Sequence, residues 1–260
     1  MVKKRLDQAL AEKGLVATRS QAESWIRMGK VFVDGRAVTK PGYFVGDDQK
    51  LELKAAERYV SRAGLKLASV AQALKLDFKD KVMLDVGSST GGFTDYALQH
   101  GARKVIAVEV GTNQMHPSLL GNLKIELHEQ TDIRDVYLKK DEGRMAKGER
   151  SLHSPFVLLH SVPDIVVVDV SFISLRDILP HIATLCRKGT IIVAMLKPQF
   201  EAGNSSLKHK GVIKNDRIRR DILKDFEAWA RQYFVVDDKA DSQVAGAKGN
   251  LERFYKLFLS

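Results

Sequence analysis

The feature that most constrains the fold of this chain is one stretch, VMLDVGSSTGGFTD at residues 82–95. Residues 82–86 are an apolar run interrupted only by an acid, which is typical of a buried strand. The glycines that follow favour a tight turn, because glycine adopts positive φ readily and lets a ligand lie against the backbone. A strand that leads into such a turn predicts a nucleoside-binding α/β domain.

The spacing of these glycines differs from the dinucleotide fingerprint. The order is G-x-x-x-G-G rather than G-x-G-x-x-G, and the residues around it are small or hydroxylated, which suits a cofactor that has no pyrophosphate. S-adenosylmethionine is such a cofactor, and a turn without any ligand is the alternative. The turn residues predicted to bind it are Asp85, Gly87, Ser88, Ser89, Thr90, Gly91, Gly92 and Phe93.

A second acid strengthens the prediction of nucleoside binding. Residues 105–110 form another apolar run, and Glu109 lies near its carboxyl end, about 20 residues beyond the glycine turn. A carboxylate at that place accepts hydrogen bonds from both ribose hydroxyls. Alone, Glu109 would be interpreted as an ordinary surface acid; together with the turn it is predicted to be the ribose ligand.

Length and composition limit the classes of protein that remain. A chain of 260 residues has room for one sizeable core and a small appended module, so two domains are expected. The single cysteine, Cys186, excludes an internal disulfide framework and a cysteine-rich zinc site, and no metal site is predicted. The amino terminus lacks the apolar stretch of a signal peptide, and no run reaches the ~20 apolar residues of a spanning helix. We therefore expect a cytoplasmic protein that does not enter membranes.

The net charge of +10 indicates a polyanionic partner. Residues 1–66 hold 14 lysines and arginines against 8 acids, so much of the excess lies in the first quarter of the chain. A well-solvated surface would also explain this balance. The functional interpretation is a module at the amino end that contacts phosphates.

The amino-terminal pattern predicts two helices and a small sheet. Residues 5–13 read as a short amphipathic helix that stops at Gly14, and a capping box at 20–23 opens a second helix closed by Gly29. Residues 31–38 form a predicted hairpin around Asp34-Gly35, a pair that favours a type I′ turn, and 50–53 alternate as a closing strand. A unit of this size has too small a core to be stable alone, so it should pack on the rest of the chain.

This segment resembles the S-four RNA-binding module. The resemblance is carried by Arg5-Leu6-Asp7-x-x-Leu10, by Thr18-Arg19-Ser20-x-Ala22 and by Gly29-Lys30-Val31-x-Val33-Asp34-Gly35. In that module the paired helices present basic side chains to structured RNA. The resemblance therefore implies RNA contacts from four basic residues of the module, Arg5, Arg19, Arg27 and Lys30. Arg62, in the first helix of the next domain, is the fifth predicted RNA-contacting residue.

The remaining sequence predicts a second, larger domain at 60–260, after an S-four-like domain at 1–53 and a linker at 54–59. Strands and helices alternate, which implies a parallel sheet covered on both faces. The charged stretch 139–154 reads as an insertion without assigned chemistry. The predicted strands are 82–86, 105–110, about 124–128, 164–170, 190–196, 233–237 and 253–259. One predicted helix ends near 76, a second follows Gly92, and two more span 175–187 and 216–231.

Four ionisable residues lie where strands end or helices begin: Lys66, Asp169, Lys197 and Glu252. Ligands of such sheets bind beyond the carboxyl ends of the strands, where Asp169 and Lys197 are both expected. A cluster of two lysines and two acids is thus a candidate catalytic group. Each residue taken alone is better explained as part of a surface ion pair.

A Lys-Asp-Lys-Glu order across such a domain resembles the RNA 2′-O-methyltransferases related to FtsJ, and its combination with an S-four module resembles the TlyA family, historically labelled haemolysin A. The motifs are 60–67, 85–95, DVSFISL at 169–175 and LKPQFE at 196–201. The resemblance implies a Rossmann-like class I methyltransferase fold, S-adenosylmethionine as cofactor, and a cytidine ribose in ribosomal RNA or ribosomal subunits as substrate. Asp132 and Asp169 join the predicted cofactor ligands.

Three departures from the family pattern concern adenosine binding rather than the reaction. The ribose acid is usually aspartate and is Glu109 here, Glu129-Gln130-Thr131-Asp132 replaces a Glu-Arg-Thr-Asn stretch, and residues 61–64 replace a sequence with a double glycine.

The reaction would require the ribose hydroxyl to be positioned and its proton relieved, and Lys197 is the predicted residue for that step. Sequence leaves open whether Lys197 is a neutral base or a cationic clamp on the developing alkoxide. A non-catalytic ribosome-binding factor, a methyltransferase for proteins or small molecules, and a membrane-active haemolysin are the alternative functions.

Overall fold

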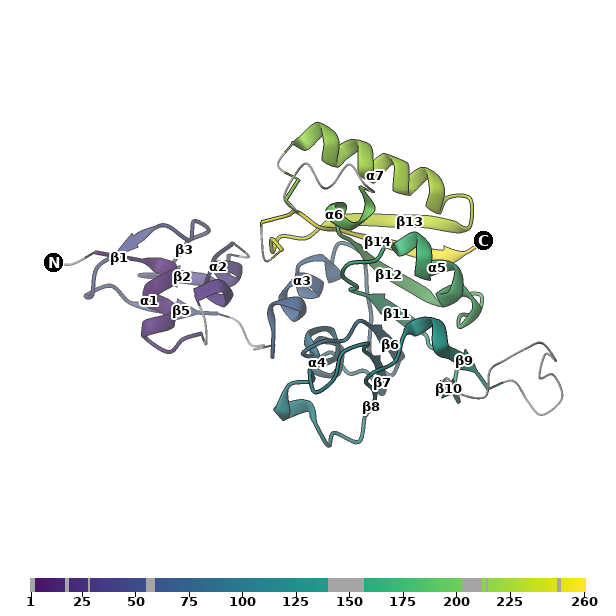
Figure 1. Ribbon diagram of the computed structural model, residues 1–260. Coiled ribbons are helices and arrows are strands. Elements are labelled where there is room, and N and C mark those ends of the chain that lie inside the picture. The colour runs from purple at the N-terminus through teal and green to yellow at the C-terminus, as the bar shows by residue number, and fades with distance from the viewer. Residues whose placement is uncertain are drawn as a thin grey trace.

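The computed structural model describes residues 3–16, 19–27, 29–54, 59–139, 157–202, 212–213, 215–246 and 249–260. Within these ranges the larger domain is built on a seven-stranded sheet with the order β13-β14-β12-β11-β6-β7-β8 (Figure 1). The last strand in the chain, β14, runs antiparallel between β12 and β13, and the other neighbours pair in parallel. The strands are β6 (Val82–Val86), β7 (Lys104–Val108), β8 (Ile125–His128), β11 (Ile165–Val168), β12 (Ile191–Leu196), β13 (Phe234–Asp241) and β14 (Arg253–Leu259).

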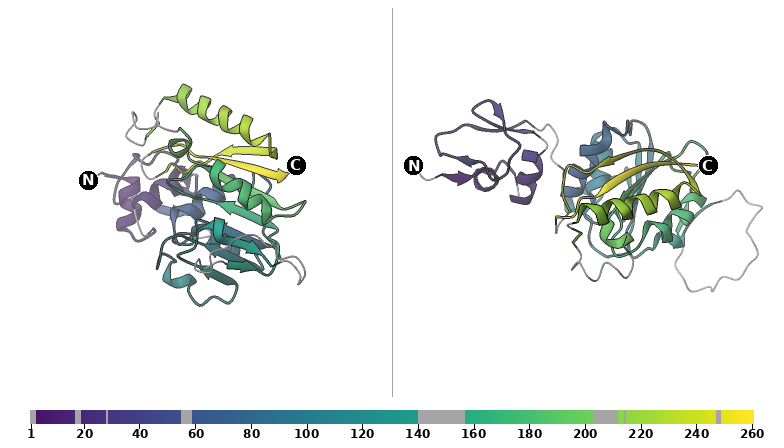
Figure 2. Two further views of the ribbon diagram at one scale, coloured as in Figure 1. Left: turned by 45° about the vertical axis from the view of Figure 1, so that its right-hand side comes forward. Right: turned by 90° about the horizontal axis from the view of Figure 1, so that it is seen from above.

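Helices cover both faces of this sheet, as the alternation in the sequence predicts. Helices α3 (Arg62–Ala71) and α4 (Gly92–Gln99) pack on one face, and α5 (Leu175–Thr184) and α7 (Asp216–Ala230) pack on the other (Figure 2). Successive strand residues point to opposite faces, so Val167 joins the core under α3 and α4 while its neighbours join the core under α5 and α7. The doubly wound α/β fold is confirmed.

Short elements connect the main ones. Helix α6 (Pro198–Glu201) follows β12 directly, and β9 (Val136–Leu138) pairs in parallel with β10 (Val157–Leu159). Two 3-10 helices occupy Pro117–Leu119 and Ile133–Asp135.

The amino-terminal module contains the predicted helices and hairpin. Helices α1 (Leu6–Glu12) and α2 (Arg19–Arg27) lie beside a sheet of β3 (Arg36–Ala37), β2 (Val31–Val33) and β5 (Leu51–Leu53). Asp34 and Gly35 have φ values of 49° and 78°, which confirms the type I′ turn. A ribbon of β1 (Lys4–Arg5) and β4 (Phe44–Val45) adds to these elements.

Several boundaries differ from the sequence prediction. Arg5 belongs to β1 because it pairs with Phe44, so α1 starts one residue later. Helix α2 starts at Arg19, before the predicted cap at Ser20, whose side chain lies outside the described structure. Strand β13 extends to Asp241 because β14 pairs with it along that length. Residues 55–58 of the predicted linker and 140–156, which include nearly all of the predicted insertion, lie outside the described residues.

Tyr59, the last residue of the predicted linker, is buried between the two parts of the chain. Its ring stacks at 6.3 Å from that of Trp25 in α2 and lies 5.4 Å from that of Tyr96 in α4. The next residue, Val60, donates its backbone N–H to Asp95 of α4 at 2.7 Å. One continuous core therefore runs from the small module into the sheet domain, which agrees with the expectation that the module needs external support. In the described part of the chain, every helix is too short or too polar to cross a membrane.

Candidate active site

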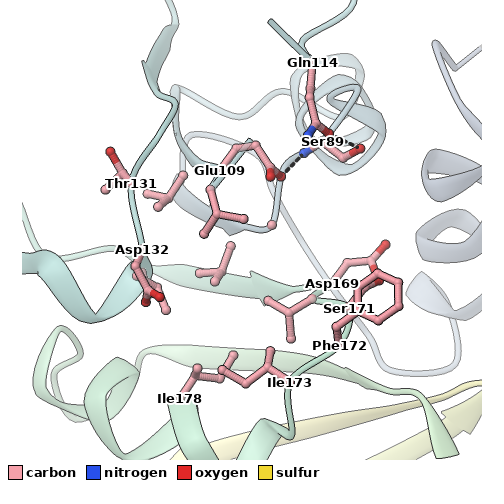
Figure 3. Close-up of a pocket in the computed structure, with 16 residues that line it drawn as sticks. Ser89, Glu109, Gln114, Thr131, Asp132, Asp169, Ser171, Phe172, Ile173 and Ile178 are labelled. Carbon is pink, nitrogen blue, oxygen red and sulfur yellow. Dashed lines mark hydrogen bonds between the residues drawn. The ribbon is translucent and has the colours of Figure 1, made fainter. Parts of the chain in front are cut away.

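A cavity of about 490 Å³ opens at the carboxyl ends of β6, β7 and β11 (Figure 3). This is the edge at which ligands of open α/β sheets bind, and the volume lies in the ordinary range for small-molecule sites. Its walls combine apolar side chains with three acids, Glu109, Asp132 and Asp169. The other lining residues are Val86, Gly87, Ser89, Val108, Val110, Gln114, Thr131, Ile133, Val170, Ser171, Phe172, Ile173 and Ile178.

The glycine turn after β6 forms one wall because a side chain does not fit there. Gly87 has φ +80°, and a Cβ on it would lie 2.6 Å from the backbone oxygen of Asp169. Gly92 lies against the start of α3, where a Cβ would meet Ala63 at 2.8 Å. The turn therefore needs glycine both for positive φ and for the close approach of neighbouring segments.

Glu109 is buried at the end of β7 with its carboxylate fixed by two backbone groups. Its Oε2 accepts from the N–H of Ser89 and its Oε1 accepts from the N–H of Gly111, both at 2.8 Å (Figure 3). Each carboxylate oxygen has further acceptor capacity, and the residue lines the cavity. Glu109 is therefore placed to accept hydrogen bonds from ribose hydroxyls.

Asp85 lies behind the turn rather than in the cavity wall. Its side chain is fully buried and accepts a hydrogen bond from Thr94 Oγ1 at 2.7 Å. Burial raises the pKa of Asp85 to about 7, and the negative charges of Asp169 and Glu109 act in the same direction. Asp85 thus connects the strand to α4, and its second oxygen, Oδ1, has no hydrogen-bond partner among the described residues.

Five of the predicted cofactor residues line the cavity and six do not. The first group is Gly87, Ser89, Glu109, Asp132 and Asp169; the second is Asp85, Ser88, Thr90, Gly91, Gly92 and Phe93. Phe93 packs inside the core against Phe254, with ring centroids 6.1 Å apart. Asp132 caps the turn that follows it, and its carboxylate forms an ion pair with Arg134 at 2.6 Å.

Sequence reasoning missed other lining residues, including Gln114, Thr131 and Ile173. Gln114 accepts a hydrogen bond from Ser89 Oγ at 3.1 Å (Figure 3). These residues follow strands that end at the same edge of the sheet as Gly87. That shared edge is the signal by which Gln114 could have been found, whereas Thr131 and Ile173 also lie in the stretches 129–132 and 169–175 that carry the family resemblance.

The four predicted catalytic residues form two ion pairs. Lys197 Nζ lies 2.6 Å from Asp169 Oδ1 and donates to Ser171 Oγ at 2.8 Å. Lys66 Nζ, on α3, lies 2.5 Å from Glu252 Oε2, and both side chains are buried. Removal of two charges from water is costly unless the pair is well formed, so each lysine is held by its acid.

The register of the sheet brings these pairs to one edge. Leu196 and Arg253 are partners in the antiparallel ladder of β12 and β14. Lys197 follows Leu196 and Glu252 precedes Arg253, so these two residues lie at the same end of neighbouring strands. Asp169 follows β11, the strand on the other side of β12. The cluster that the sequence predicted from strand ends thus lies beside the cavity wall formed by Asp169.

An exposed aromatic ring stands at the mouth of the cavity. Phe172 is 92% exposed and has φ +66°, a conformation that bulky residues rarely adopt. Its ring lies 5.1 Å from that of Phe200, and Lys197 Nζ lies 6.0 Å from the Phe200 ring. An unusual backbone conformation thus holds an apolar ring in solvent beside the Lys197 pair.

The predicted RNA-contacting residues fall into two groups. Arg5 and Arg19 both bind the buried carboxylate of Asp7, at 2.8 and 2.9 Å, so they also hold the module together. Arg27 and Lys30 are exposed at the end of α2 and beyond it, whereas Arg62 is partly buried at the start of α3. The structure therefore leaves basic groups on the surface of the module without bringing all five together.

Known proteins share this architecture. The family model of FtsJ-like methyltransferases matches residues 59–257, and that of the S4 domain matches residues 4–51. The 23S rRNA (cytidine-2′-O)-methyltransferase TlyA of Campylobacter jejuni is 39% identical over 211 residues, which are 80% of this chain and 74% of the relative. This chain belongs to the TlyA family of FtsJ-like methyltransferases.

Two further relatives cover more of the chain. Hemolysin A of Brachyspira hyodysenteriae is 34% identical over 249 residues, which are 95% of this chain and 97% of that protein. A solved structure from Streptococcus thermophilus matches with a TM-score of 0.64 and 34% identity, and the match covers all of this chain and 90% of that one. The family resemblance seen in the motifs is therefore confirmed along both parts of the chain.

Proposed function

We propose that this protein transfers the methyl group of S-adenosylmethionine to the 2′-hydroxyl of a cytidine in ribosomal RNA. The observation that carries the proposal is the Lys197–Asp169 pair, which lies beside a nucleoside-sized cavity whose opposite wall holds Glu109. The named activity of the Campylobacter relative supports the choice of base and RNA. We further propose that the protein acts in the cytoplasm, where ribosomal RNA is available.

The residues present fit the cofactor. Glu109 suits the ribose, and the apolar side chains of Val108 and Ile133 suit the flat face of a base. Around the glycine turn, the buried oxygens Ser61 Oγ, Ser88 Oγ and Asp85 Oδ1 lack hydrogen-bond partners in the described structure. These atoms lie outside the cavity wall, so the fit of the cofactor rests on Glu109, whose carboxylate oxygens keep acceptor capacity at the cavity. When bound, S-adenosylmethionine would supply a methyl group activated by the sulfonium charge.

The role of Lys197 follows from its contacts. Its amine is held between a carboxylate oxygen and the hydroxyl of Ser171, which fixes its direction and favours a charged donor. We therefore propose that Lys197 is a cationic clamp: it orients the ribose hydroxyl and stabilises negative charge that develops on that oxygen. Asp169 would orient the amine, and we propose that its carboxylate accepts the hydroxyl proton.

The second pair supports the first from α3. Lys66 and Glu252 are both buried. Glu252 immediately precedes β14, beside the position where Lys197 follows β12. We propose that this pair fixes the floor on which the target ribose lies, since a small displacement of a reacting group lowers the rate strongly.

RNA recognition is assigned to the amino-terminal module. We propose that residues 1–53 form the RNA-binding domain, 54–59 the connection, and 60–260 the catalytic domain. Arg5, Arg19, Arg27, Lys30 and Arg62 would contact phosphates, a type of contact that gives affinity dependent on salt. The exposed ring of Phe172 would stack on a nucleobase near the reacting ribose.

The proposal is tested by transfer of labelled methyl from S-adenosylmethionine to ribosomal subunits and to naked ribosomal RNA, followed by nucleoside analysis. The wild type should give 2′-O-methylcytidine, Lys197→Ala should give none, and the matched control Lys188→Ala should behave as wild type because Lys188 is exposed at the opposite edge of the sheet. Tight RNA binding by the wild type without transfer would instead support a non-catalytic ribosome-binding factor.

A further inference from the structure

Two chain segments meet beside the cavity, and their contacts extend well beyond the Lys197 pair. One segment, 169–174, connects β11 to α5, and the other, 197–201, follows β12 and includes α6. At the inner end Lys197 binds Asp169 and Ser171, and in the middle the rings of Phe200 and Phe172 are in contact. At the outer end Glu201 reaches the start of α5.

The carboxylate of Glu201 is buried and is held by hydrogen bonds. Its side chain is only 2% exposed. Its Oε1 accepts from the N–H of Leu175 and its Oε2 accepts from Ser174 Oγ, both at 2.7 Å. Arg176 Nε is 3.7 Å from the same Oε2. Burial raises the pKa of Glu201 in spite of these favourable contacts, so the carboxylate stays in an environment that is costly for its charge.

Helix α6 connects Glu201 to Lys197. Helix α6 has four residues and begins immediately after Lys197, and the N–H of Phe200 donates to the Lys197 carbonyl oxygen at 2.9 Å. A helix of one turn has little stability of its own, so its orientation depends on what holds its ends. Glu201 is the last residue of α6, and its partners are Ser174, the last residue of the segment that carries Asp169 and Ser171, and Leu175, the first residue of α5.

We infer that Glu201 is a positioning residue for methyl transfer, because its contacts with Ser174 and Leu175 set the place of the Lys197 amine relative to Asp169. It touches neither of the predicted ligands and acts through α6 and the start of α5. This inference rests on the proposed function. Loss of the contacts would let the two segments separate at their outer end, where Phe172 and Ile173 also line the cavity, while the opposite wall formed by Glu109 and the glycine turn remains unchanged.

The test compares three variants of the full-length protein. Glu201→Ala removes both contacts, Glu201→Gln retains an acceptor for Leu175 and an amide that can donate to Ser174, and Glu227→Ala is the matched control. Glu227 is a largely buried glutamate of α7 whose partners are Lys239 and Arg231. For each protein we would measure kcat at saturating S-adenosylmethionine and RNA, the Kd for S-adenosylmethionine, and the melting temperature.

The expected result is a separation of rate from binding. For Glu201→Ala, kcat should fall by about 10-fold to 100-fold, in line with a displacement of a reacting group by about 1 Å, while the Kd for S-adenosylmethionine stays within about twofold of wild type. Glu201→Gln should recover most of the loss in kcat. Ser174→Ala, which removes one of the two Glu201 contacts together with the N-cap hydrogen bond from the N–H of Arg176, should give an intermediate kcat and serves if Glu201→Ala does not fold.

Three outcomes would overturn the inference while leaving the proposed function intact. These are an unchanged kcat in Glu201→Ala, a rise in the Kd that accounts for the whole loss, or an equal fall in kcat in Glu227→Ala at a similar drop in melting temperature. A wild type that transfers no methyl group to any RNA would refute the proposed function itself, and the role of Glu201 with it.

Discussion

The buried carboxylate of Asp7 gives the sharpest quantitative test of how the amino-terminal module is held together. Burial opposes its ionisation, but hydrogen bonds from Arg5 and Arg19 outweigh that effect and lower the pKa of Asp7 from 3.8 to about 2. A shift of this size corresponds to about 2 kcal/mol. Because the arginine side chains are 40% and 54% exposed, solvent screens the pairs, and we expect a contribution of about 1–2 kcal/mol.

The sign of the pH dependence follows from the direction of the shift. The folded-state pKa lies below the unfolded value, so the stabilisation is fully present above about pH 4 and is lost as the pH falls towards 2. Asp7→Asn removes the charge but keeps the size of the side chain. It should therefore lower the free energy of unfolding by about 1–2 kcal/mol near pH 7, with a difference from wild type that shrinks in acid.

The assay is urea unfolding of the full chain followed by tryptophan fluorescence. The chain has two tryptophans, so a Trp229→Phe background leaves Trp25 of α2 as the reporter of the module. Both proteins would be measured from about pH 7 down to about pH 3, the range across which Asp7 gains its proton in the unfolded chain. A difference that is absent at neutral pH, or constant down to pH 3, would refute the reasoning.

Three further predictions concern the glycine turn, Tyr59 between the two parts of the chain, and the single cysteine, Cys186. Gly87→Ala places a Cβ 2.6 Å from the Asp169 backbone oxygen at φ +80° and should weaken S-adenosylmethionine binding at least tenfold by calorimetry; an unchanged Kd would contradict the close approach. Tyr59→Ala empties a buried ring site and should cost about 3–5 kcal/mol in urea unfolding, whereas Tyr233→Ala, at an exposed ring, should cost far less. Burial raises the pKa of the Cys186 thiol to about 12, so the native protein should react with a thiol reagent near pH 8 far more slowly than the unfolded chain.

Local features of the fold could be predicted because their causes are local. The apolar runs at 82–86 and 165–168 and the Asp34-Gly35 turn depend on few neighbours, and the structure has them where expected. Asp85 shows the limit of this reasoning. Its neighbours Leu84 and Val86 face α5 and α7, so Asp85 points to the opposite face, where Thr94 of α4 meets it. The sequence marks an acid beside the turn but not the helix that buries it.

The pairing of the four candidate catalytic residues could not be predicted from the sequence. Strand ends and a helix start marked these positions, yet the choice of Asp169 for Lys197 and Glu252 for Lys66 depends on strand order and on the antiparallel course of β14. Their catalytic role stays a prediction. The contribution of Glu201 was hidden for the same reason, since its partners lie 26 and 27 residues away in sequence.

The place of β14 has a consequence for how the enzyme is made. In order of synthesis β14 is the last strand of the sheet, yet it fills the gap between β12 and β13 and positions Glu252 at its start. Contacts between segments distant in sequence form late, and incomplete sheets expose unpaired edges. A nascent chain synthesised only as far as α7 thus contains the glycine turn, Lys66 and Lys197. In that chain one edge of β12 is unpaired, and Glu252, the partner of Lys66, is still missing. The pairing of Lys66 with Glu252 can therefore form only after this part of the chain has been synthesised, and chains cut before residue 252 should be both inactive and prone to aggregate.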